Sequence, residues 1–167
     1  MNLDGGVHHV PIPGVEGRLW LCGKHAIAPD VHAMLERTGS SHVVCLVQRH
    51  ELVDRYDDYL EWLDIASLDG RATWHPIHDL TAPGRDEFVR LVGGVHTRLA
   101  AGDGLVVHCA AGKGRAGTLG VALCLAAGMP LAQALDTVRQ HRPGAGPEVG
   151  DQLALVSGLA DTLRDLL

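Results

Sequence analysis

Long apolar runs and positive charge are both scarce in this sequence of 167 residues. No stretch approaches the roughly 20 apolar residues that a membrane-spanning helix needs. The opening segment, MNLDGGVHHVPIPG, lacks the basic start and the apolar centre of a signal peptide. The formal net charge of -6 gives no basic footprint for nucleic acid or for an anionic membrane. We therefore expect a cytoplasmic protein that binds no nucleic acid and spans no membrane.

Cysteine is also rare, and its spacing predicts neither disulfides nor a metal site. The four cysteines lie at positions 22, 45, 109 and 124 without a repeated spacing, so neither a disulfide framework nor a zinc knuckle is indicated. Cys22 and His25, and likewise His75 and His78, are spaced like metal ligands, but no matching second pair completes either set. The sequence therefore predicts reduced thiols, no metal and no cofactor.

What is present is the composition of one globular domain. Hydrophobic residues make up 46% and charged residues 20% of the chain, which is long enough to bury a single core. We expect one domain spanning residues 1–167. Residues 1–17 are rich in Gly, His and Pro, show little periodicity, and are expected to form an irregular lead-in.

Apolar runs typical of strands alternate with segments of helical periodicity in the rest of the chain. Strands are predicted at 18–22, 42–47, 73–77 and 105–107. Helices are predicted at about 30–35, 56–63, 85–101, 119–127, 131–141 and 148–166. This alternation predicts an α/β fold in which a mainly parallel sheet is flanked by helices. Ligands of such sheets bind beyond the carboxyl ends of the strands, where the loop after Val107 falls.

The segment Gly104–Thr118, GLVVHCAAGKGRAGT, carries the strongest chemical signal. A short β-branched run leads into a loop from Cys109 to Arg115, and a long apolar helix follows. Glycines at 112 and 114 allow backbone N–H groups to converge on an anion, and the helix adds its positive N-terminal end. The same field, with His108 adjacent, is expected to favour a thiolate at Cys109. A structural cysteine and a surface arginine are the alternative, which this combined context disfavours.

A cysteine and an arginine separated by five residues, with His108 before the cysteine, resemble the signature of cysteine-dependent protein tyrosine and dual-specificity phosphatases. The loop AAGKGR is most similar to the lipid and dual-specificity branch, and the flanking segments resemble the kinase-associated phosphatase (cyclin-dependent kinase inhibitor 3) family. The resemblance implies a protein tyrosine phosphatase-like fold. It also implies that Cys109 attacks phosphorus and forms a phosphocysteine, while Arg115 and the loop amides hold the phosphoryl oxygens without a metal. The phosphate-binding loop would comprise Cys109, Ala110, Ala111, Gly112, Lys113, Gly114 and Arg115.

A leaving alkoxide or phenoxide needs a proton, and Asp79 is the candidate donor. It lies before Cys109 at the expected end of a strand, and its segment PIHDLTAP is similar to the acid loop of the kinase-associated phosphatase family. A helix-capping or solvated aspartate is the alternative. Asp86 is a second candidate, but its place in the first turn of a predicted helix already explains it.

Gln152 and Glu51 complete the expected site by resemblance. Gln152, in PGAGPEVGDQ, resembles the glutamine that orients the attacking water in related enzymes, and an exposed helix residue is the alternative. Glu51, in QRHEL, resembles a glutamate that could hold Arg115 in place, and a surface charge is the alternative.

Two positions depart from the pattern of the family. Ser or Thr usually follows the arginine and stabilises the departing thiolate, whereas this chain has Ala116, with Thr118 two residues further on. The phosphatases of regenerating liver resemble this chain in carrying alanine there. We therefore expect hydrolysis of the phosphocysteine to limit turnover. Lipid phosphatases with GKGR usually carry lysine directly after the cysteine, where this chain has Ala110, which weakens a phosphoinositide assignment and leaves it open.

These features predict a phosphoprotein phosphatase that acts on tyrosine, with serine and threonine left open. The alternatives are a phosphoinositide or other small-phosphoester phosphatase and a pseudophosphatase that binds phosphopeptides. Rhodanese and arsenate reductase also use an anion-binding cysteine loop, of different length or chain position. Cys45 is expected to be a core residue, with an oxidative disulfide to Cys109 as the alternative. The sequence makes no prediction of oligomeric state.

Overall fold

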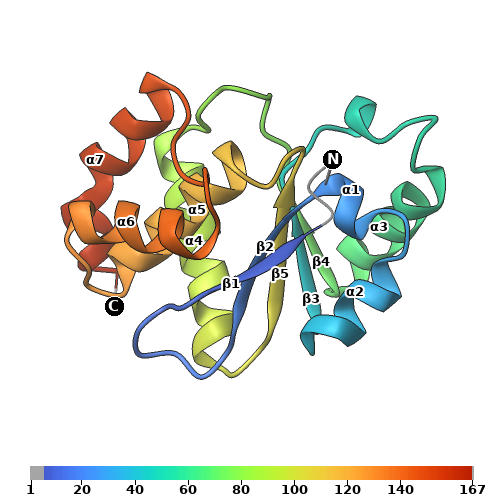
Figure 1. Cartoon of the computed structure of the whole chain (residues 1–167), viewed down its shortest axis with the longest axis horizontal. Coiled ribbons are helices and arrows are strands. Elements are labelled where there is room, and N and C mark those ends of the chain that lie inside the picture. Colours follow the sequence, from blue (N-terminus) through green and yellow to red (C-terminus); the bar gives the residue numbers. More distant parts are fainter. Residues whose placement is uncertain (1–5, 167) are drawn as a thin grey trace.

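Five strands form one sheet at the centre of the molecule (Figure 1), and the computed structural model describes residues 6–166. In spatial order the strands are β1 (Val7–Val10), β2 (Leu19–Gly23), β5 (Leu105–Cys109), β3 (His42–Cys45) and β4 (Ala72–Trp74). β1 runs antiparallel to β2, and the other neighbours are parallel. The mainly parallel sheet expected from the sequence is thus confirmed.

The two central runs, HVVC in β3 and LVVHC in β5, are buried at every position. Parallel strands covered on both faces have this continuous apolar character. The register places Cys22 of β2 and Cys45 of β3 beside His108 of β5. The carboxyl ends of all three strands therefore meet at one edge of the sheet, and the loop that follows β5 starts there.

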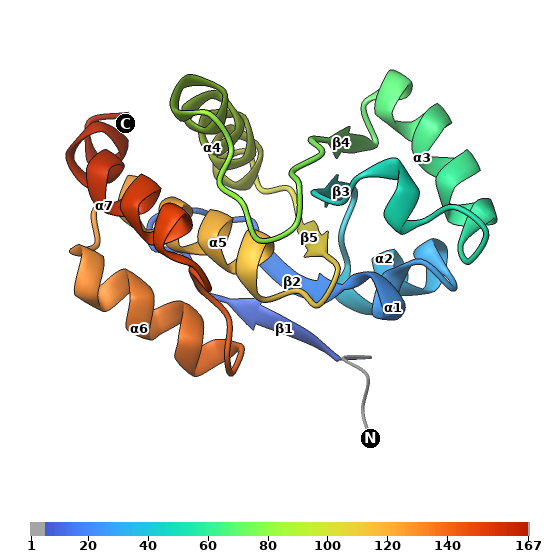
Figure 2. The same cartoon turned by 90° about the horizontal axis from the view of Figure 1, so that it is seen from above.

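Helices cover both faces of the sheet (Figure 2). One face carries α1 (Lys24–Ile27), α2 (Val31–Thr38) and α3 (Asp57–Asp69). The other face carries α4 (Arg85–Ala100), α5 (Gly114–Ala126), α6 (Leu131–His141) and α7 (Gly150–Arg164). Because α4, α6 and α7 surround α5, every residue of α5 is buried, as its apolar sequence predicts.

Three elements differ from the expectation. Residues 7–10 form β1, so the predicted irregular lead-in is wrong there, while residues 1–5 lie outside the described part of the chain. The pattern VHHV has no clear apolar alternation, and pairing with β2 imposes the extended conformation. α1 has four residues, too few for a periodic signal. α5 begins at Gly114, which puts Arg115 inside the helix rather than before it.

Within residues 6–166, no helix is both long and apolar enough to span a membrane.

Candidate active site

The loop after β5 lies against the backbone of β2. Cys109 is the last residue of β5, and α5 begins five residues later. Gly112 has φ +72°, and a Cβ built there would lie 2.3 Å from the carbonyl carbon of Cys22. Both the left-handed conformation and the close approach therefore require glycine at this position. We expect this packing to fix the path of the loop.

The loop carbonyls point away from the space that the loop encloses. The carbonyl of Ala110 accepts from the backbone N–H of Lys24, and that of Lys113 accepts from two backbone N–H groups of residues 117 and 146. Arg142 donates to the carbonyls of Ala111 and Gly112 at 2.9 and 2.7 Å. Within residues 6–166, no N–H of residues 110–115 donates to another backbone group. These amides are therefore available to an oxyanion.

Arg115 is buried, with 3% of its surface exposed, and its guanidinium is fixed on one side. Nη1 and Nη2 each donate to a carboxylate oxygen of Glu51 at 2.9 Å, and Nη1 also donates to the carbonyl of Ile77 at 2.8 Å. Nε is buried and has no hydrogen-bond partner in the described part of the chain. An unpaired buried donor is costly, so this N–H indicates a place for an anionic ligand.

Glu51 is held in turn by the segment that precedes it. Its Oε2 accepts from the backbone N–H of Gln48 at 2.8 Å, and Nζ of Lys24 donates to its carbonyl at 3.1 Å. Burial alone would raise the pKa of Glu51, but the hydrogen bonds from Arg115 and Gln48 and the nearby positive charges outweigh it and lower the pKa. Glu51 is therefore a carboxylate at neutral pH, and the structure places it where the sequence analysis expects it.

Cys109 lies at the floor of the loop, with 2% of its surface exposed. The backbone N–H of Ala116 donates to its Sγ at 3.5 Å. Thr118 does not supply the hydroxyl that Ala116 lacks, because its Oγ1 donates to the carbonyl of Gly114 at 2.6 Å. The structure thus places Thr118 as a support of the loop, apart from the sulfur.

His108 is a neutral residue of the core. Its Nε2 accepts from the hydroxyl of Tyr59 at 2.6 Å, and its Nδ1 donates to the carbonyl of Cys109 at 3.2 Å. Burial lowers its pKa to about 4, so the ring carries no charge at pH 7. The expectation that His108 adds to the positive field is therefore corrected: it orients the peptide group of Cys109.

Asp79 lies on the loop that follows β4, with 60% of its side chain exposed. Its Oδ1 lies 3.3 Å from Nη2 of Arg115 and accepts from the backbone N–H of Leu80 at 3.0 Å. Leu80 has φ +59°, a conformation that only a few per cent of non-glycine residues adopt. Asp86 lies at the start of α4, as expected. The structure therefore brings Asp79 to the site.

Gln152 is buried, with 1% exposed, so it is not the exposed helix residue of the alternative interpretation. Its Nε2 donates to the carbonyl of Thr81 at 3.3 Å, and its Oε1 accepts from the backbone N–H of Glu148 at 2.7 Å. Both ends of the amide are thus bonded to protein. Gln152 joins the loop that carries Asp79 to the start of α7.

Sequence reasoning missed three residues that touch the loop. Lys24 bonds Ala110 and Glu51, Arg142 bonds two loop carbonyls, and the Glu148 carboxylate lies beside Gly114. None stands in a motif next to Cys109, and only the fold brings them there. Lys113 belongs to the loop predicted from the sequence, and its side chain lies along Gly144.

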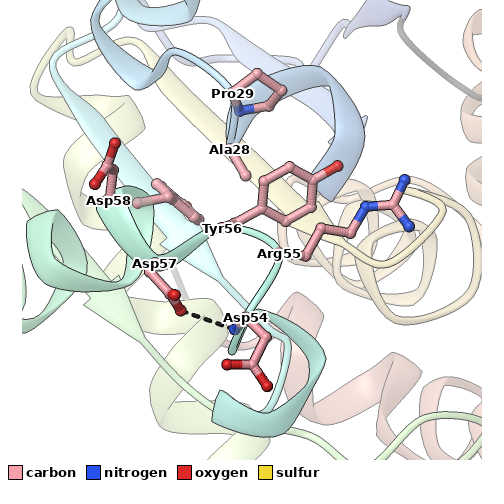
Figure 3. A pocket seen from close by; sticks show the side chains of 8 residues that line it. Ala28, Pro29, Asp54, Arg55, Tyr56, Asp57 and Asp58 are labelled. Carbon is pink, nitrogen blue, oxygen red and sulfur yellow. Dashed lines mark hydrogen bonds between the residues drawn. The ribbon is translucent and has the colours of Figure 1, made fainter.

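A separate hollow of about 270 Å³ lies between the end of α1 and the start of α3 (Figure 3). It is lined by Ala28, Pro29, Asp54, Arg55, Tyr56, Asp57, Asp58 and Tyr59. No residue of 109–115 lines it. It therefore lies apart from the loop that follows β5, on the segment that precedes α3.

No group of three or more potential ligands within residues 6–166 is arranged to hold a metal ion. The residues present suit a phosphoryl group, because they offer free backbone amides, a buried guanidinium and a thiol on one loop.

The comparisons with known proteins agree with this geometry. The family model described as "Polymorphic toxin system, DSP-PTPase phosphatase" matches residues 21–129. No curated protein matches the sequence.

Solved structures of phosphatases resemble the whole fold. The active form of Tk-PTP is 27% identical over 92% of this chain and 96% of its own, with a TM-score of 0.68. Kinase associated phosphatase, with its catalytic-site cysteine replaced by serine, is 20% identical over 95% and 96%, with a TM-score of 0.76. The human tyrosine phosphatase-like serine/threonine/tyrosine-interacting protein is 20% identical over 93% and 97%, with a TM-score of 0.68. The expected similarity to kinase-associated phosphatase is thus confirmed.

Since the family model covers more than half of the sequence and includes the loop from Cys109 to Arg115, this chain belongs to the DSP-PTPase phosphatase family of polymorphic toxin systems.

Proposed function

We propose that residues 1–167 form a phosphoprotein phosphatase that acts on tyrosine, and also on serine or threonine, through a phosphocysteine at Cys109. The observation that carries the proposal is that, within residues 6–166, the buried Nε of Arg115 has no hydrogen-bond partner and the N–H groups of residues 110–115 donate to no backbone carbonyl. A phosphoryl group bound there would accept from Nε and from the amides, while Glu51 keeps the guanidinium in place.

In the first step, Sγ of Cys109 attacks phosphorus in line with the leaving oxygen, and the bond from phosphorus to that oxygen breaks as the P–S bond forms. Arg115 and the loop amides hold the three non-bridging oxygens. Asp79 gives its proton to the leaving oxygen. Asp79 is proposed for this role because of its position, on an exposed loop with its Oδ1 3.3 Å from Nη2 of Arg115.

In the second step, water attacks the phosphocysteine and the thiolate leaves. Asp79, now a carboxylate, takes the proton of this water. We propose that Gln152 helps to position this water indirectly. Its amide bonds Thr81, on the loop that carries Asp79, and Glu148, and so fixes that loop relative to the start of α7. Nε2 carries a second N–H and Oε1 a second lone pair, so contact of Gln152 with the water does not require release of the 3.3 Å bond to Thr81.

A protein substrate is favoured over a phosphoinositide by the charges around the loop. Ala110 stands where lipid phosphatases carry lysine, Lys113 lies along Gly144, and the formal net charge is -6. None of the four cysteines forms a disulfide, which suits a reducing compartment such as the cytoplasm.

Asp79→Asn tests the assignment of the acid. We expect kcat to fall about 10²-fold with phenyl phosphate, a poor leaving group, and much less with p-nitrophenyl phosphate, since a stable leaving group needs little protonation. The measurement is kcat for both substrates between pH 5 and 8. The matched control is Asp86→Asn, at the exposed start of α4, which should leave both rates unchanged. Equal losses with both substrates would argue against Asp79 as the proton donor.

Ala116→Ser tests the second step. Residue 116 is buried and its N–H already faces Sγ, so a serine hydroxyl would be placed near the departing thiolate. We expect kcat for p-nitrophenyl phosphate to rise severalfold and the burst of p-nitrophenol in stopped-flow measurements to diminish. Thr118→Val serves as a comparison, because its hydroxyl bonds Gly114 rather than sulfur. If the serine variant changes neither burst nor turnover, hydrolysis of the intermediate is not the slow step.

A phosphopeptide-binding pseudophosphatase is the second candidate, and Ala116 is the feature that favours it. A binder would hold phosphotyrosine peptide without releasing inorganic phosphate.

A further inference from the structure

Arg142 is the largest fully buried side chain in the described part of the protein, with 1% of its surface exposed. It follows the last residue of α6 and precedes Pro143 and Gly144. Buried arginine is rare unless its donors are engaged. The contacts of this guanidinium therefore indicate what it does.

The guanidinium lies behind the phosphate loop. Nε donates to the carbonyl of Gly112 at 2.7 Å, and Nη2 donates to the carbonyl of Ala111 at 2.9 Å. Its far side meets the N-terminal strand, where Nη1 donates to Nδ1 of His8 at 2.7 Å and to the carbonyl of Gly6 at 3.4 Å. One side chain thus connects β1 to two consecutive residues of the loop.

These two carbonyls differ from those of Ala110 and Lys113. The carbonyls of Ala110 and Lys113 are held by backbone N–H groups, whereas those of Ala111 and Gly112 are held by a side chain. A peptide plane turns as a unit, so holding a carbonyl outward directs the N–H of the next residue inward. Arg142 thus controls the direction of the N–H groups of Gly112 and Lys113, next to the glycine at φ +72°.

We propose that Arg142 is a positioning residue that orients the amides of the phosphate loop toward the oxyanion, and that its guanidinium adds a fixed positive charge behind them. The proposal rests on the proposed function for the identity of the ligand. Arg142 does not touch the phosphoryl group, so its effect passes through the two peptide groups that it bonds. Removing it should weaken oxyanion binding even where the fold survives.

The test compares Arg142→Met, which keeps the apolar stem, with Arg142→Lys, which keeps the charge but cannot bridge two carbonyls in a fixed geometry. Tungstate, a phosphate analogue, is the probe, and its affinity is measured by calorimetry alongside kcat and KM for p-nitrophenyl phosphate and the melting temperature. We expect tungstate to bind at least tenfold more weakly to Arg142→Met and kcat/KM to fall about 10²-fold. For Arg142→Lys, we expect a tungstate affinity and a kcat/KM between those of the wild type and Arg142→Met.

Two controls separate positioning from stability. Val138→Ala removes a fully buried side chain of the same helix, α6, and should lower the melting temperature without changing tungstate affinity. Arg139→Met removes a nearby exposed charge and should change neither. The proposal is overturned if folded Arg142→Met binds tungstate with an affinity within twofold of that of the wild type. If Arg142→Met does not fold, the same criterion applies to Arg142→Lys.

Tungstate binding does not depend on turnover, so the two proposals can fail separately. Wild-type protein that binds tungstate but releases no phosphate contradicts the phosphatase activity, while the Arg142 comparison still decides the positioning role. If the wild type is fully active and the Arg142 variants have the same tungstate affinity and kcat/KM as the wild type, only the positioning role is contradicted.

Discussion

Cys109→Ser should abolish phosphatase turnover and leave oxyanion binding in place. A serine hydroxyl is far less ionised than a thiol at neutral pH, and the hydrogen-bond partner of Sγ at this position is the backbone N–H of Ala116 rather than a base. The loop amides and Arg115 are unchanged by the substitution. We expect kcat for p-nitrophenyl phosphate to fall by on the order of 10⁴-fold or more, while tungstate affinity stays within a fewfold of the wild type.

Rapid acid quench of the wild-type enzyme during turnover of a ³²P-labelled phosphopeptide should trap label on the protein, and peptide mapping should place it at Cys109. Cys124→Ser is the matched control, because Cys124 is buried in α5, where burial raises the pKa of its thiol to about 12. That variant should keep its turnover. Activity equal to the wild type in Cys109→Ser would contradict the phosphocysteine mechanism. Wild-type binding of phosphopeptide without any phosphate release would instead support the pseudophosphatase.

Arg115→Lys should lower kcat/KM by on the order of 10³-fold. Lysine offers one compact ammonium in place of a planar fork, so it cannot bond both oxygens of Glu51 and still present a second donor edge to a phosphoryl group. The loss should fall on kcat as well as KM, because oxygens that gain charge in the transition state lose a bidentate partner. Steady-state kinetics with p-nitrophenyl phosphate and calorimetry with tungstate measure both effects.

Arg139→Lys, on the exposed side of α6, is the control and should leave both constants unchanged. Glu51→Gln gives an independent check, since it keeps the shape of the partner but removes the charge that holds Arg115. We expect its kcat/KM to lie between that of the wild type and that of Arg115→Lys. A fully active Arg115→Lys variant would show that the guanidinium does not bind the phosphoryl group.

The local chemistry of the site was readable from the sequence. Strand, loop and helix around Cys109 follow from a β-branched run, closely spaced glycines and an apolar segment, all of which act over a few residues. Gly112 is needed for reasons of backbone conformation, and the order of strands and helices predicted the parallel sheet. The buried α5 likewise follows from its uniformly apolar sequence.

The sequence could not show which distant groups hold that loop. Arg142 directly follows α6 and belongs to no recognisable motif, and Lys24 lies in a helix too short to predict. Both nevertheless bond carbonyls of the loop. Thr118 lies close in sequence to Cys109, but helical geometry sends its hydroxyl back to Gly114. Contacts of this kind depend on how elements pack, which no local pattern encodes.

Charge states also depended on the tertiary structure. A histidine next to a cysteine is ambiguous in the sequence, and burial against Tyr59 makes His108 neutral by lowering its pKa to about 4. The sequence by itself predicted Cys109 as the nucleophile, together with Arg115 and the glycines between them, because the strand, loop and helix that carry them are local structures. Only the tertiary structure decided how that loop is oriented, since its carbonyls are held by Lys24 of α1 and by Arg142 after α6, and Arg142 in turn bonds His8 of β1.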